Sequence, residues 1–243
     1  MMYRHEGART LAISQPAHAW ISGQLMRRLA LKLPETLLLA GEQHDIGWID
    51  WERAPPFDPA TGRAPSFREV GPVAHAPMWT QGVERALAAW GPHAALMISR
   101  HGGRIYRRFG LPHAGPDEAR AIQGYLAAQA PREAEWAGSL GLDEATLDYQ
   151  STLIGFADAL SLAVCGALKP PAELDLPVGK ARLEEAGPWD LRLKPWPFKG
   201  GAFAMEGEGR LMPEAGRFAD EAEMRAWQAS PRRATFRTRL APG

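Results

Sequence analysis

The sequence is short of cysteine, of net charge and of long apolar runs, and each shortage excludes a class of protein. The single cysteine, Cys165, excludes an internal disulfide, so a metal site has to be judged on histidine and carboxylate side chains. Because 28 Lys and Arg balance 28 Asp and Glu, no excess charge indicates a nucleic-acid polymer or an anionic membrane as partner. These features favour a reducing compartment, most simply the cytoplasm.

Long apolar segments are also missing. The N-terminal segment lacks the hydrophobic stretch of a signal peptide. The longest nearly uncharged run, Ile154–Leu168, has fifteen residues and is interrupted by Asp158, so it is too short to span a bilayer. There is no internal repeat and no low-complexity tract. The 45% hydrophobic and 23% charged residues are typical of a soluble globular protein with a substantial core.

The apolar and capping patterns predict a mainly helical fold. Ser14 and Pro16 suit the start of a helix that runs to about residue 32. Further helices are expected over residues 34–47, 77–90, 92–102, 116–129 and 143–168. Residues 53–74, rich in proline and glycine, are expected to form a long ordered loop of the kind that often covers a site. Residues 1–13 fit a strand or an arm.

The character of the sequence changes after Lys169. Pro170 and Pro171 end the long helix. Short strands are expected over residues 189–194, 201–205 and 235–240, with a helix near 220–227. We therefore expect a helical domain over residues 1–169 and a small α+β appendage over residues 170–243 packed on it. The predicted fold class is mainly α, a helical bundle with a small C-terminal β-containing appendage.

Histidine and aspartate residues recur in or beside the helical segments. The strongest local pattern is EQHDIGW, residues 42–48, in which adjacent imidazole and carboxylate groups near a helix end can bind one metal ion. Asp158 interrupts an apolar helix, where a buried carboxylate is unfavourable unless it is paired or bound to a metal. The candidate metal ligands, in chain order, are His18, His44, Asp45, His75, His101 and Asp158.

This order of residues resembles the ligand set of the HD superfamily of metal-dependent phosphohydrolases. The separations of 26, 30, 26 and 57 residues resemble those of members that hold two metal ions. The segments QPAHA, EQHDIGW, SRHG and DALSL are similar to those of an uncharacterised bacterial family within the superfamily, which supplies no activity. That closer resemblance covers most of the chain.

The resemblance implies an HD-domain helical bundle with a dinuclear centre, in which Asp45 is the bridging and catalytic carboxylate. The other ligands of the first ion would be His18, His44 and Asp158. Those of the second ion would be His75 and His101. The implied cofactors are two divalent or trivalent metal ions, with iron first and manganese, zinc or magnesium as alternatives. Water activated by these ions would be the nucleophile.

The sequence departs from the superfamily at one position. Where many HD proteins carry a lysine after the His-Asp-x-Gly motif, this chain has Trp48, which removes a cation that can contact phosphate. Arg104 is a candidate replacement, because guanidinium suits phosphate and carboxylate recognition. Trp48 and Trp51 are a candidate aromatic wall for a ring or an apolar group. Gln15, one turn before His18, is a further candidate substrate contact.

Ordinary structural roles compete with these assignments. A structural role is favoured for His5, His93, His113 and Cys165. Glu42 and Asp50 are candidate proton carriers and fit surface residues equally well. Trp48 also fits a core residue, and Arg104 also fits a solvated cation. His75 is expected in a loop just before a helix.

Three functions are compatible with this sequence. The first is a metal-dependent hydrolase that acts on a phosphate ester or nucleotide, by analogy at the level of the fold. The second is a mixed-valent di-iron oxygenase similar to those that cleave organophosphonates or inositol. The third is a non-catalytic signalling module, which the apparently complete ligand set argues against. The expected partner is a small phosphorylated substrate, and self-association into a homo-oligomer is left open.

Overall fold

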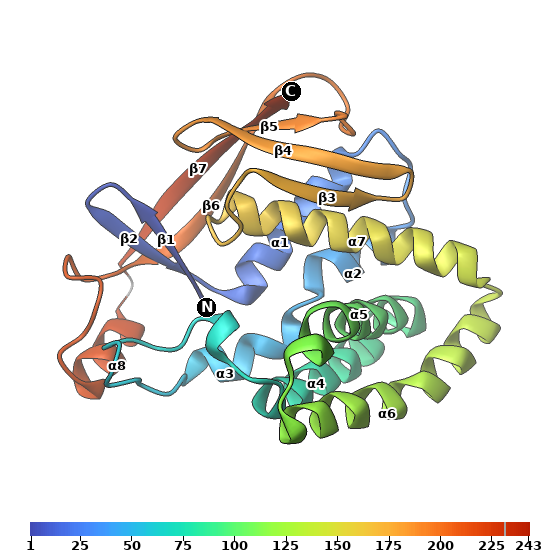
Figure 1. Cartoon of the computed structure of the whole chain (residues 1–243), viewed down its shortest axis with the longest axis horizontal. Helices are drawn as coiled ribbons and strands as arrows, with labels where there is room; N and C mark the ends of the chain where they lie inside the picture. Colours follow the sequence, from blue (N-terminus) through green and yellow to red (C-terminus); the bar gives the residue numbers. More distant parts are fainter. Residues whose placement is uncertain (231) are drawn as a thin grey trace.

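The structure, a computed structural model, describes residues 1–230 and 232–243. Within these residues, seven strands form one curled mixed sheet that lies over the helices (Figure 1). The prediction of a mainly α, or all-α, fold with a small β appendage is therefore wrong. The sheet is an integral part of the molecule, because strands from both ends of the chain build it.

The helices lie close to the expected positions, with different ends. They are α1 (Gln15–Arg28), α2 (Glu35–Gln43), α3 (Ile49–Arg53), α4 (Pro72–Trp90), α5 (Pro92–Ile105), α6 (Pro116–Leu140), α7 (Glu144–Val164) and α8 (Glu221–Ala229). Ser14 caps α1 as predicted, because its hydroxyl accepts the N–H of Ala17 at 3.2 Å. Helix α4 begins at Pro72, so His75 lies in its first turn rather than in a loop.

Shorter turns link these helices. They are the 3₁₀ turns η1 (Ile46–Trp48), η2 (Phe67–Glu69) and η4 (Leu111–His113) and the π-helical turn η3 (Tyr106–Gly110). In the described part of the chain, no helix combines the length and the apolar character needed to cross a membrane.

The sheet joins the first and last parts of the chain. Its strands are β1 (Met2–Glu6), β2 (Arg9–Ile13), β3 (Ala172–Leu176), β4 (Gly179–Gly187), β5 (Asp190–Lys194), β6 (Phe203–Leu211) and β7 (Arg233–Pro242). They lie in the order β1-β2-β6-β7-β5-β4-β3. All neighbours are antiparallel except β5 and β7, which are parallel. The pairing of Leu11 with Leu211 attaches the N-terminal hairpin to β6.

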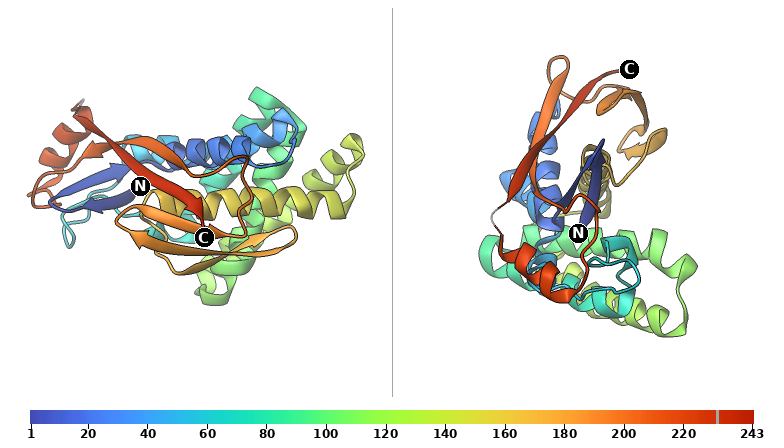
Figure 2. Two further views of the ribbon diagram at one scale, coloured as in Figure 1. Left: turned by 90° about the horizontal axis from the view of Figure 1, so that it is seen from above. Right: turned by 90° about the vertical axis from the view of Figure 1, so that its left-hand side faces the viewer.

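One hydrophobic core connects the sheet to the helices. Ala181 and Leu183 alternate with exposed residues along β4, and both belong to the same buried cluster as Leu25 of α1 and Leu160 of α7. Helices α1 and α7 run side by side beneath the sheet (Figure 2). The sheet therefore covers the two helices that carry His18 and Asp158.

Candidate metal centre

His44 and Asp45 are positioned by the end of α2 and the tight turn that follows it. His44 is the C-terminal cap of α2, and Asp45 immediately precedes η1. Gly47 lets this turn lie directly against α4, because a Cβ at this position would lie 2.0 Å from the backbone oxygen of Met78. The glycine of the motif therefore has a packing role: it allows the His-Asp pair to be held against α4.

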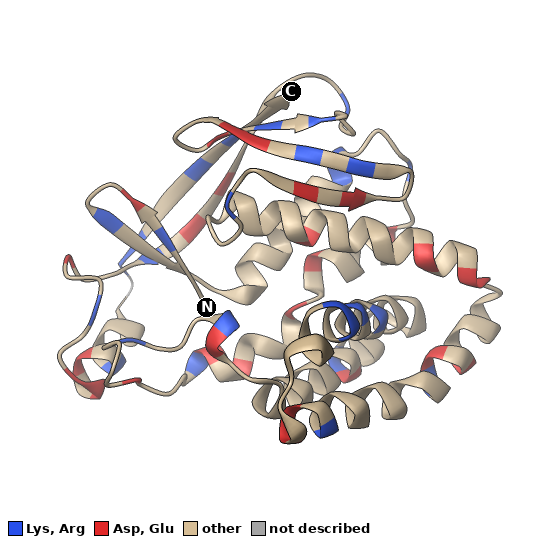
Figure 3. Cartoon of the chain, viewed as in Figure 1, with Lys and Arg blue, Asp and Glu red and all other residues tan. Residues whose placement is uncertain are grey.

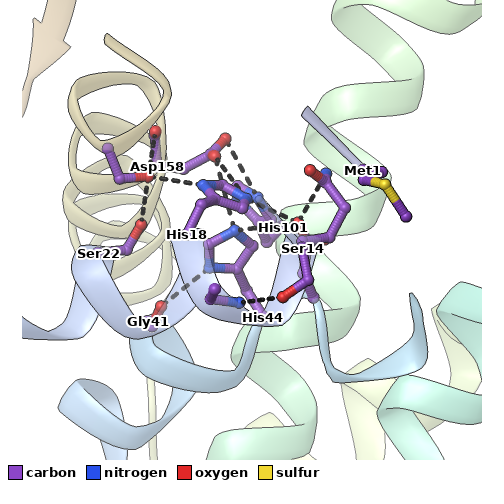
Figure 4. A network of polar contacts seen from close by, with 12 residues as sticks. Met1, Ser14, His18, Ser22, Gly41, His44, His101 and Asp158 are labelled. Carbon is purple, nitrogen blue, oxygen red and sulfur yellow. Dashed lines mark hydrogen bonds and ion pairs between the residues drawn. The ribbon is translucent and has the colours of Figure 1, made fainter. Parts of the chain in front are cut away.

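Three further helices bring ligand candidates to the same point. His18 comes from α1, His101 from α5 and Asp158 from α7, and their side chains point toward His44 (Figure 4). The three histidines are each 1% exposed, and Asp45 is 5% exposed. Candidate ligand atoms lie within 4.8 Å of one another in two overlapping groups, His18–His44–Asp45 and His44–His101–Asp158. We call these five residues the ligand cluster.

The atoms of the ligand cluster are spaced much like ligands of a shared cation. Nε2 of His18 lies 2.8 Å from Oδ2 of Asp45. Nε2 of His44 and Nε2 of His101 each lie 3.5 Å from a carboxylate oxygen of Asp158. Atoms that bind one ion at roughly 2.0–2.2 Å lie about 3–3.5 Å apart. The ligand cluster is therefore close in size to a coordination sphere.

Two histidines of the cluster present buried nitrogens that lack a partner among the described residues. Both ring nitrogens of His101, and Nε2 of His44, accept and donate no hydrogen bond there. Nδ1 of His44 lies 2.9 Å from the carbonyl of Gly41, which can only accept, so a neutral His44 ring presents its lone pair at Nε2. Because unpartnered buried polar atoms are unfavourable, a cation between these nitrogens and the carboxylates would satisfy them. The residues thus fit a metal ion.

Hydroxyl groups fix the orientation of His18. Its Nδ1 lies 2.7 Å from Oγ of Ser161, and Ser161 donates its own proton to the backbone oxygen of Asp158 at 2.8 Å. Ser22 also donates to Ser161, at 2.9 Å. Since the proton of Ser161 is already used, its oxygen accepts Nδ1–H of His18. The ring therefore presents Nε2 to the ligand cluster, as a metal ligand requires.

The two carboxylates of the ligand cluster favour positive charge beside them. Burial disfavours a charged His44, but Asp45 and Asp158 outweigh burial and raise its pKa to about 9. Burial and the nearby His44 lower the pKa of His101 to about 4. Burial opposes ionisation of Asp158, yet the His44 ring 3.5 Å away holds its pKa below the usual range. Ionised carboxylates beside a neutral imidazole are a donor set that divalent transition metals prefer.

His75 lies outside the ligand cluster. Among the described residues, the groups of converging ligand atoms do not include it. Its ring centroid lies 4.8 Å from Trp48 and 5.8 Å from Tyr106, and burial lowers its pKa to about 4. Nε2 of His75 is buried and has no partner in the described part of the chain. His75 nevertheless lines the same cavity as the ligand cluster.

A cavity of about 510 Å³ opens onto the ligand cluster, a volume typical of small-molecule sites. Its aromatic lining consists of Trp48, Phe67, Trp79 and Phe109. Its charged lining consists of Arg68, Arg104, Arg108, Glu173 and Asp175. The cavity therefore combines a metal-ligand floor with aromatic and cationic walls.

Gln15, Trp48 and Arg104, three of the predicted substrate contacts, line this cavity, whereas Trp51 does not. Gln15 is 3% exposed and donates from Nε2 to Oδ2 of Asp45 at 3.1 Å, so it contacts a ligand directly. Trp48 is 2% exposed, and Trp51 packs edge-to-face on it with ring centroids 5.5 Å apart. Arg104 lines the cavity too. Its guanidinium donates hydrogen bonds to the side chains of Thr152 and Asp175.

Other residues weighed from the sequence lie elsewhere. Asp50 pairs with Arg85, and Glu42 lies 3.3 Å from Arg27. Neither carboxylate is among the residues that line the cavity. The ring nitrogens of His93 form hydrogen bonds with Oγ1 of Thr36, at 2.6 Å, and with Oε1 of Gln150, at 2.8 Å. Cys165 is buried, which raises the pKa of its thiol to about 12.

Sequence reasoning missed part of the cavity lining. Arg108 repeats Arg104 after four residues, a helical spacing that places both on one face, so this signal was available. Asp175 lies in the alternating segment AELDL of β3, a strand that was not expected. Arg68 lies in the proline-rich loop, where no pattern indicated its direction.

Comparison with known proteins gives a family and no activity. A family model described as "Protein of unknown function (DUF3891)" matches residues 1–214. Neither the curated proteins nor the solved structures contain a match to the chain.

Proposed function

The chain belongs to the DUF3891 family, and we propose that it is a metal-dependent hydrolase that acts on a phosphate ester or nucleotide. The observation that carries this proposal is the ligand cluster, in which four buried and one partly buried imidazole and carboxylate side chains lie at the floor of a cavity. The reaction class comes from the resemblance to the HD superfamily, an analogy that rests on the order of the ligand residues in the sequence.

The proposed cofactors are two metal ions, with iron first and manganese, zinc or magnesium as alternatives. His18, His44, Asp45 and Asp158 would hold the first ion, and His75 and His101 would hold the second ion together with Asp45. Bound ions would supply Lewis acidity, which stabilises charge on phosphoryl oxygens and lowers the pKa of water.

The chain itself orients the reacting groups. The amide of Gln15 holds one oxygen of Asp45, while Ser161 and the carbonyl of Gly41 set the tautomers of His18 and His44. Mutation of such hydrogen-bond partners of metal ligands typically lowers metal affinity or activity by about 10- to 100-fold. The buried ring of Trp48 limits access of water to one side of the site.

A panel of phosphomonoesters and nucleotides tests this proposal. Metal-loaded protein is expected to release inorganic phosphate or a nucleotide product from at least one member. Asp45→Asn is expected to lower that rate by more than about 100-fold, because even outer partners of metal ligands are worth 10- to 100-fold. Asp50→Asn is the matched control, since Asp50 is half-exposed, pairs with Arg85 and does not line the cavity. No product from any panel member would contradict the proposal.

An oxygenase with two iron ions is the second candidate. The aromatic rings of Trp48 and Trp79 beside the ligand cluster favour it, because they suit an apolar substrate group. It predicts oxygen uptake coupled to substrate oxidation, together with a mixed-valence signal in electron paramagnetic resonance. Protein that contains only zinc or manganese and is active in that form excludes it.

A further inference from the structure

Two arginines follow His101 along one face of the same helical segment. Arg104 lies three residues and Arg108 seven residues beyond His101, and these spacings repeat the helical turn. At a rise of 1.5 Å per residue, the two side chains start roughly 5 and 10 Å along the axis from His101. Both line the cavity that opens onto the ligand cluster. The end of α5 and the turn η3 thus place two guanidiniums on the wall of the cavity that has the ligand cluster at its floor.

Asp175 pairs with the guanidiniums of both Arg104 and Arg108. Nη2 of Arg104 lies 3.1 Å from Oδ2 of Asp175, and Nη1 of Arg108 contacts the same oxygen. Arg104 also donates to the hydroxyl of Thr152 at 3.1 Å. The side chains of Arg104, Arg108 and Asp175 are 33%, 49% and 26% exposed, so water and solutes reach them. This group is therefore an anion site in which the anion is at present Asp175 itself.

The surrounding charge favours a further anion. Arg68 lines the same cavity and donates to the backbone oxygen of Ala167 at 2.9 Å. This acceptor is a neutral carbonyl and does not balance the positive charge of Arg68. Glu173, the other acidic residue of this wall, is paired with Lys180 at 2.8 Å. Figure 3 shows acidic residues along β3 and basic residues along α5. Three guanidiniums and two carboxylates line this wall, and Lys180 pairs with one of the carboxylates, so the balance of charge on this wall is positive.

We propose that Arg104 and Arg108 bind a phosphate group of the substrate that lies away from the reacting phosphate, and that this group displaces Asp175. The inference rests on the proposed function and adds a substrate class: nucleotide-sized molecules with two anionic groups. Guanidinium suits this role, because it forms paired, charge-assisted hydrogen bonds with phosphate oxygens. Because Asp175 lies on β3, the displacement also implies that this strand takes part in substrate binding.

Calorimetric titration of adenosine 3′,5′-bisphosphate, a nucleotide with two phosphate groups, into chelator-treated protein tests the arginine pair without any hydrolysis. Wild-type protein is expected to bind the nucleotide. The Arg104→Gln/Arg108→Gln variant is expected to bind it at least about tenfold more weakly, because it loses the charge-assisted hydrogen bonds of both guanidiniums. The matched control is Arg100→Gln, on the same helix, since Arg100 pairs with Glu144 and Asp148 instead. Equal affinity of the double variant and wild type would overturn the proposal, as would no binding by wild type.

Asp175→Asn separates anion exchange from a purely structural role. Removing the resident carboxylate is expected to tighten nucleotide binding roughly two- to fivefold, since a partly exposed ion pair contributes up to about 1 kcal/mol. If Asp175 only holds the arginines in place, binding becomes weaker instead. Unchanged or weaker binding, in a variant whose circular dichroism matches wild type, would contradict the exchange.

The two proposals fail in different ways. Phosphoester hydrolysis by metal-loaded protein, with nucleotide binding unaffected by the arginine substitutions, would leave the hydrolase standing and refute the arginine site. Arginine-dependent binding without hydrolysis of any phosphoester would refute the hydrolase and leave the arginine site.

Discussion

Ser161 determines which nitrogen of His18 faces the ligand cluster. Ser161→Ala removes the acceptor of Nδ1–H, so His18 loses its fixed tautomer and orientation. We expect metal affinity to fall by about 10- to 100-fold with the fold retained, as is typical for partners of metal ligands. The measurement is competitive metal titration against a chromophoric chelator.

Ser151→Ala is the matched control for this substitution. Ser151 lies on the same helix, α7, and its buried hydroxyl has no partner in the described part of the chain. Its removal is expected to leave metal affinity unchanged. Equal affinities of the Ser161→Ala variant and wild type would show that His18 does not need this hydroxyl to bind a metal.

The candidate ligands could be named from the sequence because burying them is chemically unusual. Asp158 stands out as a carboxylate in an apolar helix, and the structure places it 3.5 Å from Nε2 of His44. The local structure around His75 was harder to predict from the sequence. The proline-rich stretch before it indicated a loop, whereas Pro72 sits at the first turn of α4, where a proline has no N–H bond to lose.

Gly47 sets how closely the motif turn packs on α4. Gly47→Ala would place a Cβ 2.0 Å from the backbone oxygen of Met78, which a side-chain rotation cannot relieve. Overpacking of this kind typically lowers the free energy of unfolding by about 1–3 kcal/mol. We also expect weaker metal binding, because His44 and Asp45 move with the turn. Urea unfolding measured by circular dichroism tests the first effect.

Gly124→Ala is the control, because Gly124 lies within α6 and its Cβ would meet no atom within 4 Å. That substitution is expected to raise the free energy of unfolding by about 0.5–1 kcal/mol, as alanine favours helix over glycine. A Gly47→Ala variant as stable as wild type would mean that the turn does not pack on α4 as described.

The strands were harder to predict than the helices, for a physical reason. A strand shows its buried face only through alternation over a few residues, which is a weak signal in a short segment. The alternation of Ala181 and Leu183 with charged neighbours was present in the sequence but was not recognised as β4. The pairing of β2 with β6 was inaccessible, because contacts between distant segments leave no local pattern.

Arg4 connects three distant parts of the molecule. It is fully buried on β1, and it donates to Thr238 of β7 at 2.8 Å and to the backbone oxygen of Val164, the last residue of α7. Its guanidinium carbon lies 3.4 Å from the ring centroid of Trp189. The end of α7 is thereby tied to the edge strand β1 and, through Thr238, to the central strand β7.

Because of these contacts and the shared core, we expect one cooperative unfolding transition. Tryptophan fluorescence and far-ultraviolet circular dichroism should give coincident urea curves. Arg4→Met is expected to lower the free energy of unfolding by about 3–5 kcal/mol, as removal of one member of a buried charged network does. Arg9→Met, which removes a half-exposed partner of the same Glu6, is expected to change it by less than about 1 kcal/mol. Two separate transitions would show that the sheet and the helices unfold independently.

The central claim is that the ligand cluster binds metal, and metal content measures it most directly. Elemental analysis of anaerobically purified protein is expected to find at least about one transition-metal ion per chain, and two if His75 completes the second site. Asp158→Asn, which removes the charge nearest to His44 and His101, is expected to lose that metal. Wild-type protein that neither retains nor takes up a metal ion, or a variant that binds metal as tightly as wild type, would contradict the account.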